Sequence, residues 1–296
     1  MLLAACGGPG LLPQACGLTT PVSLPVEMHG RAPTVNVVIN QQKVNLLVDT
    51  GANVTVLSRK TADRLNVVGL AGSMVGQRAV GGTGTAVRAR IDQMQIGPLT
   101  LPAMRVAISN EAPFDGVLGL DVLQRYDVEI ELLRSRIVLH PGGLCPGDLP
   151  PLEGSYVEIP AARTIISGHG ANRVTEPYLL VPVRLDGKEA LAMLDSGSMA
   201  GTLVSPGLAA SVGVSELALA QDVSARVTGF GTGVPMHGHR FGELDVGREV
   251  FKKPLMLVGG DPNGLFAMVI GSDYFFQHRI WFSFSSDRIF VVPLAR

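Results

Sequence analysis

An internal repeat constrains this chain more than any other feature. Residues 44–52 form an apolar run that ends in Asp-Thr-Gly-Ala, and residues 190–198 form a second run that ends in Asp-Ser-Gly-Ser. Two further pairs of segments follow in the same order, one glycine-rich and one apolar with a Gly two residues before an Asp: residues 78–84 with 226–232, and residues 114–121 with 266–273. The repeat predicts two similar units in one chain.

The composition fits short strands joined by tight turns. Apolar types make up 46% of the 296 residues, and the chain holds 36 Gly and 20 Pro, which favours an all-β fold. Each unit opens with a predicted hairpin that leads to its Asp: strands at 35–39 and 44–48, then at 181–185 and 190–194. Short helices are predicted after the capping residues Ser58, to residue 65, and Ser205, to residue 212.

The repeat and the composition also divide the chain. We expect an N-terminal tether over residues 1–30, a first lobe over 31–140, a Pro- and Gly-rich linker over 141–154, and a second lobe over 155–296. Lobes of this length can each bury a core of their own.

Asp49 and Asp195 are the candidate catalytic residues. One Asp-Thr/Ser-Gly triplet alone is an ordinary turn, but here each copy follows an apolar strand and precedes a glycine-rich segment. This pattern, repeated in order over about residues 35–292, resembles the retropepsin and pepsin families of aspartic peptidases. The resemblance implies two tandem, pseudo-symmetric β-barrel lobes with short helices. It also implies an endopeptidase that activates a water molecule between the two carboxyl groups.

Two carboxyl groups suit peptide hydrolysis without a metal or a covalent nucleophile. Held close together they cannot both ionise easily, so they share a proton, and one acts as general base while the other donates. The resemblance assigns support of the two loops to the residues that follow each Asp: Thr50, Gly51, Ala52, Ser196, Gly197 and Ser198. The alternative is that either hydroxyl only satisfies its own turn.

The glycine-rich segments resemble flaps, hairpins that close over an extended peptide. The candidate flap residues are Val80, Gly81, Gly82, Thr83 and Gly84 in the first lobe and Thr228, Gly229, Phe230 and Gly231 in the second. The alternative is a pair of plain flexible hairpins. A flap in both lobes is more typical of a retropepsin dimer fused into one chain, so we expect activity as a monomer.

The chain departs from the retropepsin pattern at several positions. Asn53 and Met199 stand where a second Asp is usual, and no Arg follows Gly119 or Gly271, so the usual ion pair behind the active site is missing. These departures put contacts with the substrate backbone in doubt more than the catalytic pair.

The residue after each triplet also differs between the lobes. It is Ala52 in the first and Ser198 in the second. A Ser198 hydroxyl that donates to Asp195 would favour the ionised form of that carboxyl, so we expect the shared proton on Asp49. The alternative is that Ser198 satisfies a backbone group.

The N-terminus resembles the lipobox of bacterial lipoproteins, with Cys6 as the residue that would carry lipid. Only five residues precede Cys6, whereas a signal peptide has an apolar stretch of about 7 to 15. The alternatives are a true start further upstream or an accidental match. The lipobox interpretation predicts a lipid anchor and a bacterial cell envelope or periplasmic location.

Cys16 and Cys145 could form a disulfide in an oxidising compartment, though nothing in the sequence demands it.

Charge and spacing exclude several other functions. A formal net charge of −1 and the absence of a Lys/Arg run argue against nucleic acid, so the expected partner is a protein or peptide substrate. No cofactor is implied, and His237 with His239 lacks a third ligand nearby, which favours a solvated strand over a metal site. Two alternatives to an enzyme stay open: a catalytically silent peptide-binding protein of this fold, and an envelope scaffold.

Overall fold

The computed structural model describes residues 20–79, 82–142, 148–167, 173–227, 233–259 and 266–294. The first half contains these elements: β1 Val22–His29, β2 Ala32–Ile39, β3 Gln42–Val48, β4 Val56–Ser58, α1 Arg59–Arg64, β5 Gly69–Ala79, β6 Gly82–Ile91, β7 Met94–Ile96, β8 Leu99–Leu101, β9 Met104–Ser109, β10 Gly116–Leu118, α2 Leu120–Leu123, β11 Asp127–Glu131, a 3-10 turn Leu132–Arg134 and β12 Arg136–His140.

The second half repeats this strand-rich pattern. Its elements are β13 Val157–Pro160, β14 Ala162–Ser167, β15 Arg173–Leu185, β16 Lys188–Leu194, β17 Leu203–Val204, α3 Pro206–Ser211, α4 Glu216–Leu219, β18 Val223–Val227, β19 Val234–Arg240, β20 Glu243–Val246, β21 Glu249–Lys252, β22 Leu255–Gly259, β23 Met268–Ile270, α5 Ser272–Phe275, β24 His278–Ser283 and β25 Arg288–Pro293. The predicted all-β class with short helices is confirmed. None of the helices in the described part of the chain could cross a membrane.

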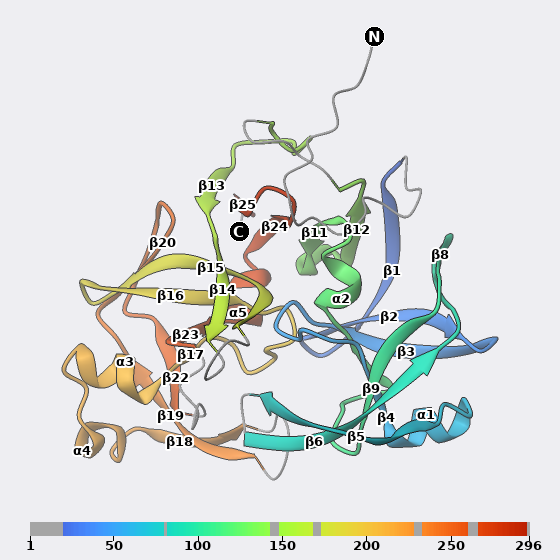
Figure 1. The fold of residues 1–296 in the computed structure, drawn as a ribbon. Coiled ribbons are helices and arrows are strands. Elements are labelled where there is room, and N and C mark those ends of the chain that lie inside the picture. The colour runs from blue at the N-terminus through green and yellow to red at the C-terminus, as the bar shows by residue number, and fades with distance from the viewer. Residues whose placement is uncertain are drawn as a thin grey trace.

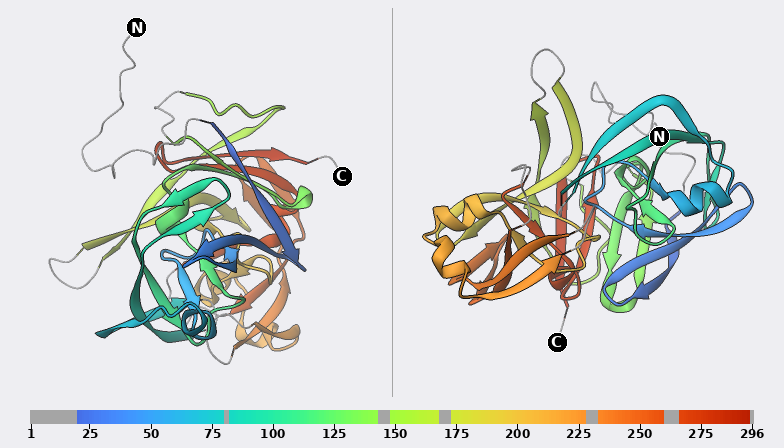
Figure 2. Two further views of the ribbon diagram at one scale, coloured as in Figure 1. Left: turned by 90° about the vertical axis from the view of Figure 1, so that its right-hand side faces the viewer. Right: turned by 90° about the horizontal axis from the view of Figure 1, so that it is seen from below.

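The two halves form two lobes that lie side by side (Figures 1 and 2). The predicted opening hairpins are present as β2 with β3 in lobe 1 and β15 with β16 in lobe 2. The predicted helix caps are also confirmed. The Ser58 hydroxyl accepts from the Thr61 N–H at the start of α1, and the Ser205 hydroxyl accepts from the Leu208 N–H at the start of α3.

Each lobe carries the same strand crossing around its Asp. In lobe 1, β10 lies between β3, to which it is parallel, and β4, to which it is antiparallel. In lobe 2, β23 lies between β16 and β17 in the same way. Because the Asp loops follow β3 and β16, this crossing fixes both loops at the same end of their lobes.

One antiparallel row of strands joins the lobes. Its order is β13-β25-β24-β11-β12-β1, and the lobes meet where β11 of lobe 1 pairs with β24 of lobe 2. Figure 1 shows β11 and β12 beside β24 and β25 between the lobes. The tether predicted over 1–30 is too long, because Val22–His29 form β1, which pairs with β12 and β2. The other domain limits stay predictions.

The contact between the lobes contains buried charged groups. Glu129 of β11 is 1% exposed, and its carboxylate accepts from His140 at 2.8 Å and from Arg279 of β24 at 2.5 Å. The indole N–H of Trp281 donates to Asp127 at 3.3 Å. Burial raises the pKa of Asp127 to about 7, so the protonation of this carboxyl group affects the contact between the lobes.

Candidate active site

The two candidate catalytic residues lie at the ends of matching strands. Asp49 follows β3 and its N–H donates to the Leu118 carbonyl at 3.1 Å, while Asp195 follows β16 and its N–H donates to the Ile270 carbonyl at 2.9 Å. Each Asp loop is thus tied to the strand that crosses its lobe. The buried apolar strands on both sides leave the loops little freedom to move.

The structure brings the two carboxyl groups together across the lobes. A Cβ atom at Gly51 would lie 2.5 Å from Cγ of Asp195, and a Cβ atom at Gly197 would lie 2.6 Å from Oδ2 of Asp49. Any larger residue at either position would therefore collide with the opposite carboxyl group. The two carboxyl groups are hydrogen-bonded to each other.

Each carboxyl group is also held by its own loop. The N–H of Gly51 donates to Oδ1 of Asp49 at 2.7 Å, and the N–H of Gly197 donates to Oδ1 of Asp195 at 2.8 Å. These matched contacts orient the two side chains alike about the axis that relates the lobes.

Burial raises the pKa of both carboxyl groups. The pKa of Asp195 is raised well above its ordinary value, first by burial and then by the negative charge of Asp49 beside it. The pKa of Asp49 is raised by burial, but the hydrogen bond from Asp195 lowers it in part. The pair therefore keeps one proton at a pH where isolated Asp side chains have lost theirs.

The hydroxyl of Ser198 has a different partner from the one expected from the sequence. Its hydroxyl donates to the Gly201 carbonyl at 3.0 Å. The predicted hydrogen bond from Ser198 to Asp195 is wrong, and the alternative that Ser198 satisfies a backbone group holds. The Ser198 hydroxyl therefore does not stabilise the ionised form of Asp195.

The hydroxyl groups of Thr50 and Ser196 cross between the lobes. The Thr50 hydroxyl donates to the Leu194 carbonyl at 2.7 Å and accepts from the Ser196 N–H at 3.0 Å. The Ser196 hydroxyl donates to the Val48 carbonyl at 2.8 Å and accepts from the Thr50 N–H at 3.1 Å. Four buried hydrogen bonds thus lock one loop against the other, and neither hydroxyl serves only its own turn.

A second layer of polar contacts supports each loop, through residues that the sequence motifs had not assigned a role. Thr55 donates to Asp121 at 2.7 Å, and Thr202 donates to Asp273 at 2.9 Å. The Thr55 hydroxyl also accepts from the N–H of Gly119 at 3.2 Å. The signal was visible, since both Asp residues stand two positions after the repeated Gly and both Thr residues follow the triplets.

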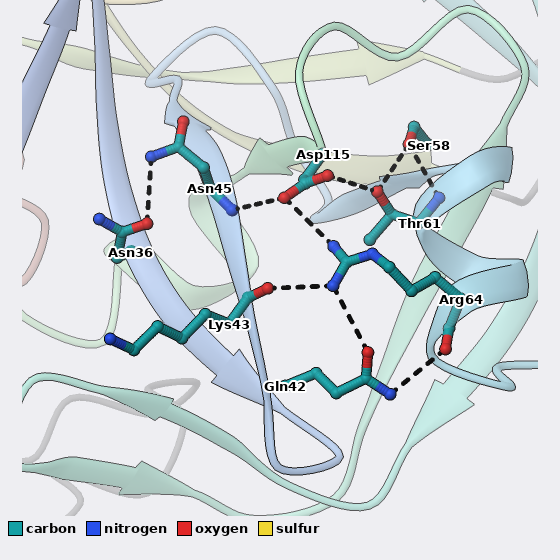
Figure 3. A network of polar contacts seen from close by, with 8 residues as sticks. All are labelled: Asn36, Gln42, Lys43, Asn45, Ser58, Thr61, Arg64 and Asp115. Carbon is teal, nitrogen blue, oxygen red and sulfur yellow. Dashed lines mark hydrogen bonds and ion pairs between the residues drawn. The ribbon is translucent and has the colours of Figure 1, made fainter.

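Lobe 1 has a further network centred on Asp115 (Figure 3). Its carboxylate accepts from the Asn45 N–H at 2.9 Å and from the Thr61 hydroxyl at 2.9 Å, and it pairs with Arg64 at 3.3 Å. The network ties α1 to β3 and to the segment that precedes β10. Lobe 2 has Ala267 at the corresponding position.

A small apolar cluster lies beside the Asp loop of lobe 1, separate from the main core. It joins strands β2, β3, β4, β6, β9 and β10 through Ala32, Leu47, Val56, Ala86, Ala107 and Val117. Ala52, which follows the catalytic triplet, and Val75 of β5 pack against it. The middle of the β5 and β6 hairpin and the catalytic loop therefore pack against the same cluster.

The predicted flap of lobe 1 corresponds to this hairpin. Gly82, Thr83 and Gly84 belong to β6 and pair with β5, whereas Val80 and Gly81 lie outside the described residues. In lobe 2, β18 pairs with β19, but Thr228, Gly229, Phe230 and Gly231 lie outside the described residues. So do Cys6, Cys16 and Cys145. No cluster of metal-binding side chains occurs in the described part of the chain.

Comparisons with known proteins identify the family of each half. A model of gag-polyprotein putative aspartyl proteases matches residues 35–125, and a model of aspartyl proteases matches residues 181–274. An aspartic proteinase from Irpex lacteus has the same fold, with a TM-score of 0.56, 14% identity, and coverage of 93% of this chain and 98% of that one.

Curated relatives match part of the chain. DNA damage-inducible protein 1 of Chaetomium globosum is 30% identical over 148 residues, which are 46% of this chain and 33% of that protein. Protein DDI1 homolog 2 of Homo sapiens is 30% identical over 148 residues, or 47% and 34%. Protein DDI1 homolog 1 of Bos taurus is 31% identical over 144 residues, or 46% and 33%. The matched region is about a third of each relative's length.

These relatives overturn one expectation. The bacterial envelope or periplasmic location is wrong, because the curated relatives are proteins of a fungus and of animals. Its basis was a short run of small residues before a Cys, which occurs readily by chance. With each half matched to an aspartyl protease family and the whole folded as an aspartic proteinase, the chain belongs to the retropepsin-like and pepsin-like aspartic peptidases.

Proposed function

We propose that this chain is an aspartic endopeptidase in which Asp49 and Asp195 act together on one water molecule. The observation that carries the proposal is the hydrogen-bonded pair of carboxyl groups, one from each lobe, with raised pKa values. The ionised Asp49 takes a proton from water as it attacks the peptide carbonyl, and the protonated Asp195 donates to the carbonyl oxygen. Asp49 then gives the proton taken from water to the leaving nitrogen as the C–N bond breaks, and a hydroxyl of the gem-diol intermediate returns a proton to Asp195.

The substrate is an extended polypeptide held between the lobes. The β5 and β6 hairpin covers it from lobe 1, and the β18 and β19 hairpin covers it from lobe 2. The apolar cluster beside Ala52 is buried, so it supports the lobe 1 side of the catalytic loop from beneath. Main-chain hydrogen bonds to the hairpins supply affinity that does not depend on substrate sequence.

One folded chain holds both carboxyl groups, so the active form is a monomer. The catalytically silent alternative would need neither the paired carboxyl groups nor their raised pKa values. No observation favours a scaffold role.

The test is cleavage of a denatured protein mixture by purified wild type across acidic to neutral pH. We expect cleavage that a statine-type transition-state mimic blocks and that disappears in Asp49→Asn and Asp195→Asn. An identical set of products from wild type and from both variants would reject the proposal, because a contaminating protease would explain it. Absence of cleavage by wild type at every pH would reject it as well.

A further inference from the structure

Three arginine residues lie on one face of the lobe 1 sheet. Arg88 and Arg90 alternate along β6, and Arg105 of β9 is the register partner of Arg90. All three side chains are exposed. Side chains two positions apart on a strand point to the same face, so the three guanidinium groups form one basic stripe.

The basic stripe continues from the apolar cluster beside the catalytic loop. Ala86 precedes Arg88 by two residues on β6, and Ala107 is the register partner of Arg88 on β9. Both alanines belong to that cluster, against which Ala52 packs. At about 3.3 Å per residue, Arg88 and Arg90 lie roughly 7 and 13 Å beyond Ala86.

The charges of the basic stripe are not compensated within the described residues. None of the three guanidinium groups forms an ion pair or hydrogen bond with another described residue. Asp92 follows β6 but pairs with none of them. Like charges placed opposite each other on a sheet destabilise it, and here Arg90 faces Arg105 while the whole chain has a net charge of −1. The stripe is thus a local positive field.

We propose that Arg88, Arg90 and Arg105 bind an acidic segment of the polypeptide substrate, a few residues away from the bond that is cleaved. This inference rests on the proposed function and deepens it by naming a substrate class. An acidic peptide fits better than nucleic acid, because β6 and β9 carry no aromatic side chain on which a base could stack.

The experiment compares two peptides that share one cleavable core, mapped on the protein mixture. One peptide has a short run of Asp and Glu on one flank, and the other has Asn and Gln at the same positions. Both flanks are tested. At low salt we expect the acidic peptide to have a kcat/KM about tenfold higher on one flank. The gain should lie in KM, because a contact remote from the reacting atoms binds substrate and transition state alike.

Substitution of the basic stripe should remove the preference. The variant Arg88→Gln/Arg90→Gln/Arg105→Gln should cleave both peptides equally, with the kcat of wild type on the Asn/Gln peptide. Arg184→Gln, which removes an exposed charge of lobe 2, is the matched control and should keep the preference. Salt at about 1 M should abolish it in wild type, since the Debye length falls to about 3 Å.

An equal preference in wild type and in the triple variant would overturn the inference, and so would no preference in wild type. If wild type cleaves neither peptide, the proposed function fails separately. Binding of the same labelled peptides, followed by fluorescence anisotropy, then decides the role of the stripe. Equal affinities for the acidic and amide forms would reject it. Displacement of the acidic peptide by a much lower concentration of single-stranded oligonucleotide would also reject it.

Discussion

The two lobes hold their aspartates alike but anchor the strands behind them differently. Both use the same strand crossing and exchange the same hydroxyl contacts. Behind the loop, lobe 1 places Asp115 at the centre of a polar network, whereas lobe 2 has Ala267 there. The lobes are therefore matched at the catalytic loops and differ behind the loop of lobe 1. The matched loops bring the two carboxyl groups together.

The largest expected effect tests the symmetry of the two catalytic loops. Thr50→Ala leaves the Leu194 carbonyl and the Ser196 N–H without partners, and Ser196→Ala leaves the Val48 carbonyl and the Thr50 N–H without partners. Each change should lower the free energy of unfolding by about 3 kcal/mol. Thr50→Ser and Ser196→Thr keep the hydroxyl and should cost under about 1 kcal/mol. Chemical denaturation measures the free energy of unfolding of all four variants. A clear difference between the two Ala variants would show that the two loops do not contribute equally.

The next effect concerns the pairing of β11 with β24. The pKa of Asp127 is about 7 in the folded protein against 3.8 unfolded, so its contribution to stability is complete below pH 3.8 and is lost as pH rises to about 7. The slope approaches 1.4 kcal/mol per pH unit. The catalytic pair contributes with the same sign, so the difference between wild type and Asp127→Asn isolates Asp127. We expect the variant to have the flatter curve.

Fluorescence checks the same group directly. Trp281 is the only tryptophan of the chain, and its indole donates to Asp127. Its emission should titrate with a midpoint near pH 7 in wild type and not in Asp127→Asn. The ring of His140 lies 4.0 Å from that of Trp281, so His140→Gln is the control and should retain the midpoint. Loss of the transition in His140→Gln alone would assign it to the histidine instead.

A smaller effect tests the Asp115 network behind the catalytic loop of lobe 1. Asp115→Ala should lower the free energy of unfolding by about 2 kcal/mol, because it removes acceptors from the Asn45 N–H and the Thr61 hydroxyl. Double-mutant cycles should give a coupling of about 1 kcal/mol with Thr61→Val and under about 0.5 kcal/mol with Arg64→Gln, whose side chain is 40% exposed. A stronger coupling to Arg64 would make the network mainly ionic.

The smallest effect concerns the hydroxyl that only lobe 2 carries. Ser198 donates to Gly201 rather than to Asp195, so Ser198→Ala should lower the free energy of unfolding by about 1 kcal/mol and leave the pH profile of kcat/KM unchanged. Ala52→Ser is the matched change in lobe 1. A profile displaced by Ser198→Ala would revive the contact with Asp195 and place the proton on Asp49.

Local patterns predicted much of this architecture. Patterns within short segments were enough to predict the two hairpins, the helices capped by Ser58 and Ser205, and the two Asp loops. The repeat then implied that Asp49 and Asp195 meet. The pairing of β11 with β24 was not predictable, because the sequences of residues 127–131 and 278–283 contain no pattern that indicates which distant strand each one pairs with.

Side-chain choices were harder to predict than strands. A hydroxyl such as that of Ser198 has several acceptors within reach, and the backbone geometry at Gly201, with φ of +96°, decides which one it meets. The Asp115 network likewise depends on the distance between α1 and β3, which no local pattern encodes. The tether was predicted to be too long because residues 22–29 form a strand by pairing with β2 and β12, which their own sequence does not indicate.

We propose that the two carboxyl groups, one from each lobe, share one proton and act as a unit in catalysis. The pH profile of kcat/KM on one mapped peptide tests this directly in wild type, Asp49→Asn and Asp195→Asn, with inhibitor binding measured in parallel. Wild type should give a bell-shaped profile, and both variants should lose at least about 10³-fold at every pH while still binding the statine-type mimic. Activity within about tenfold of wild type in either variant would contradict the account.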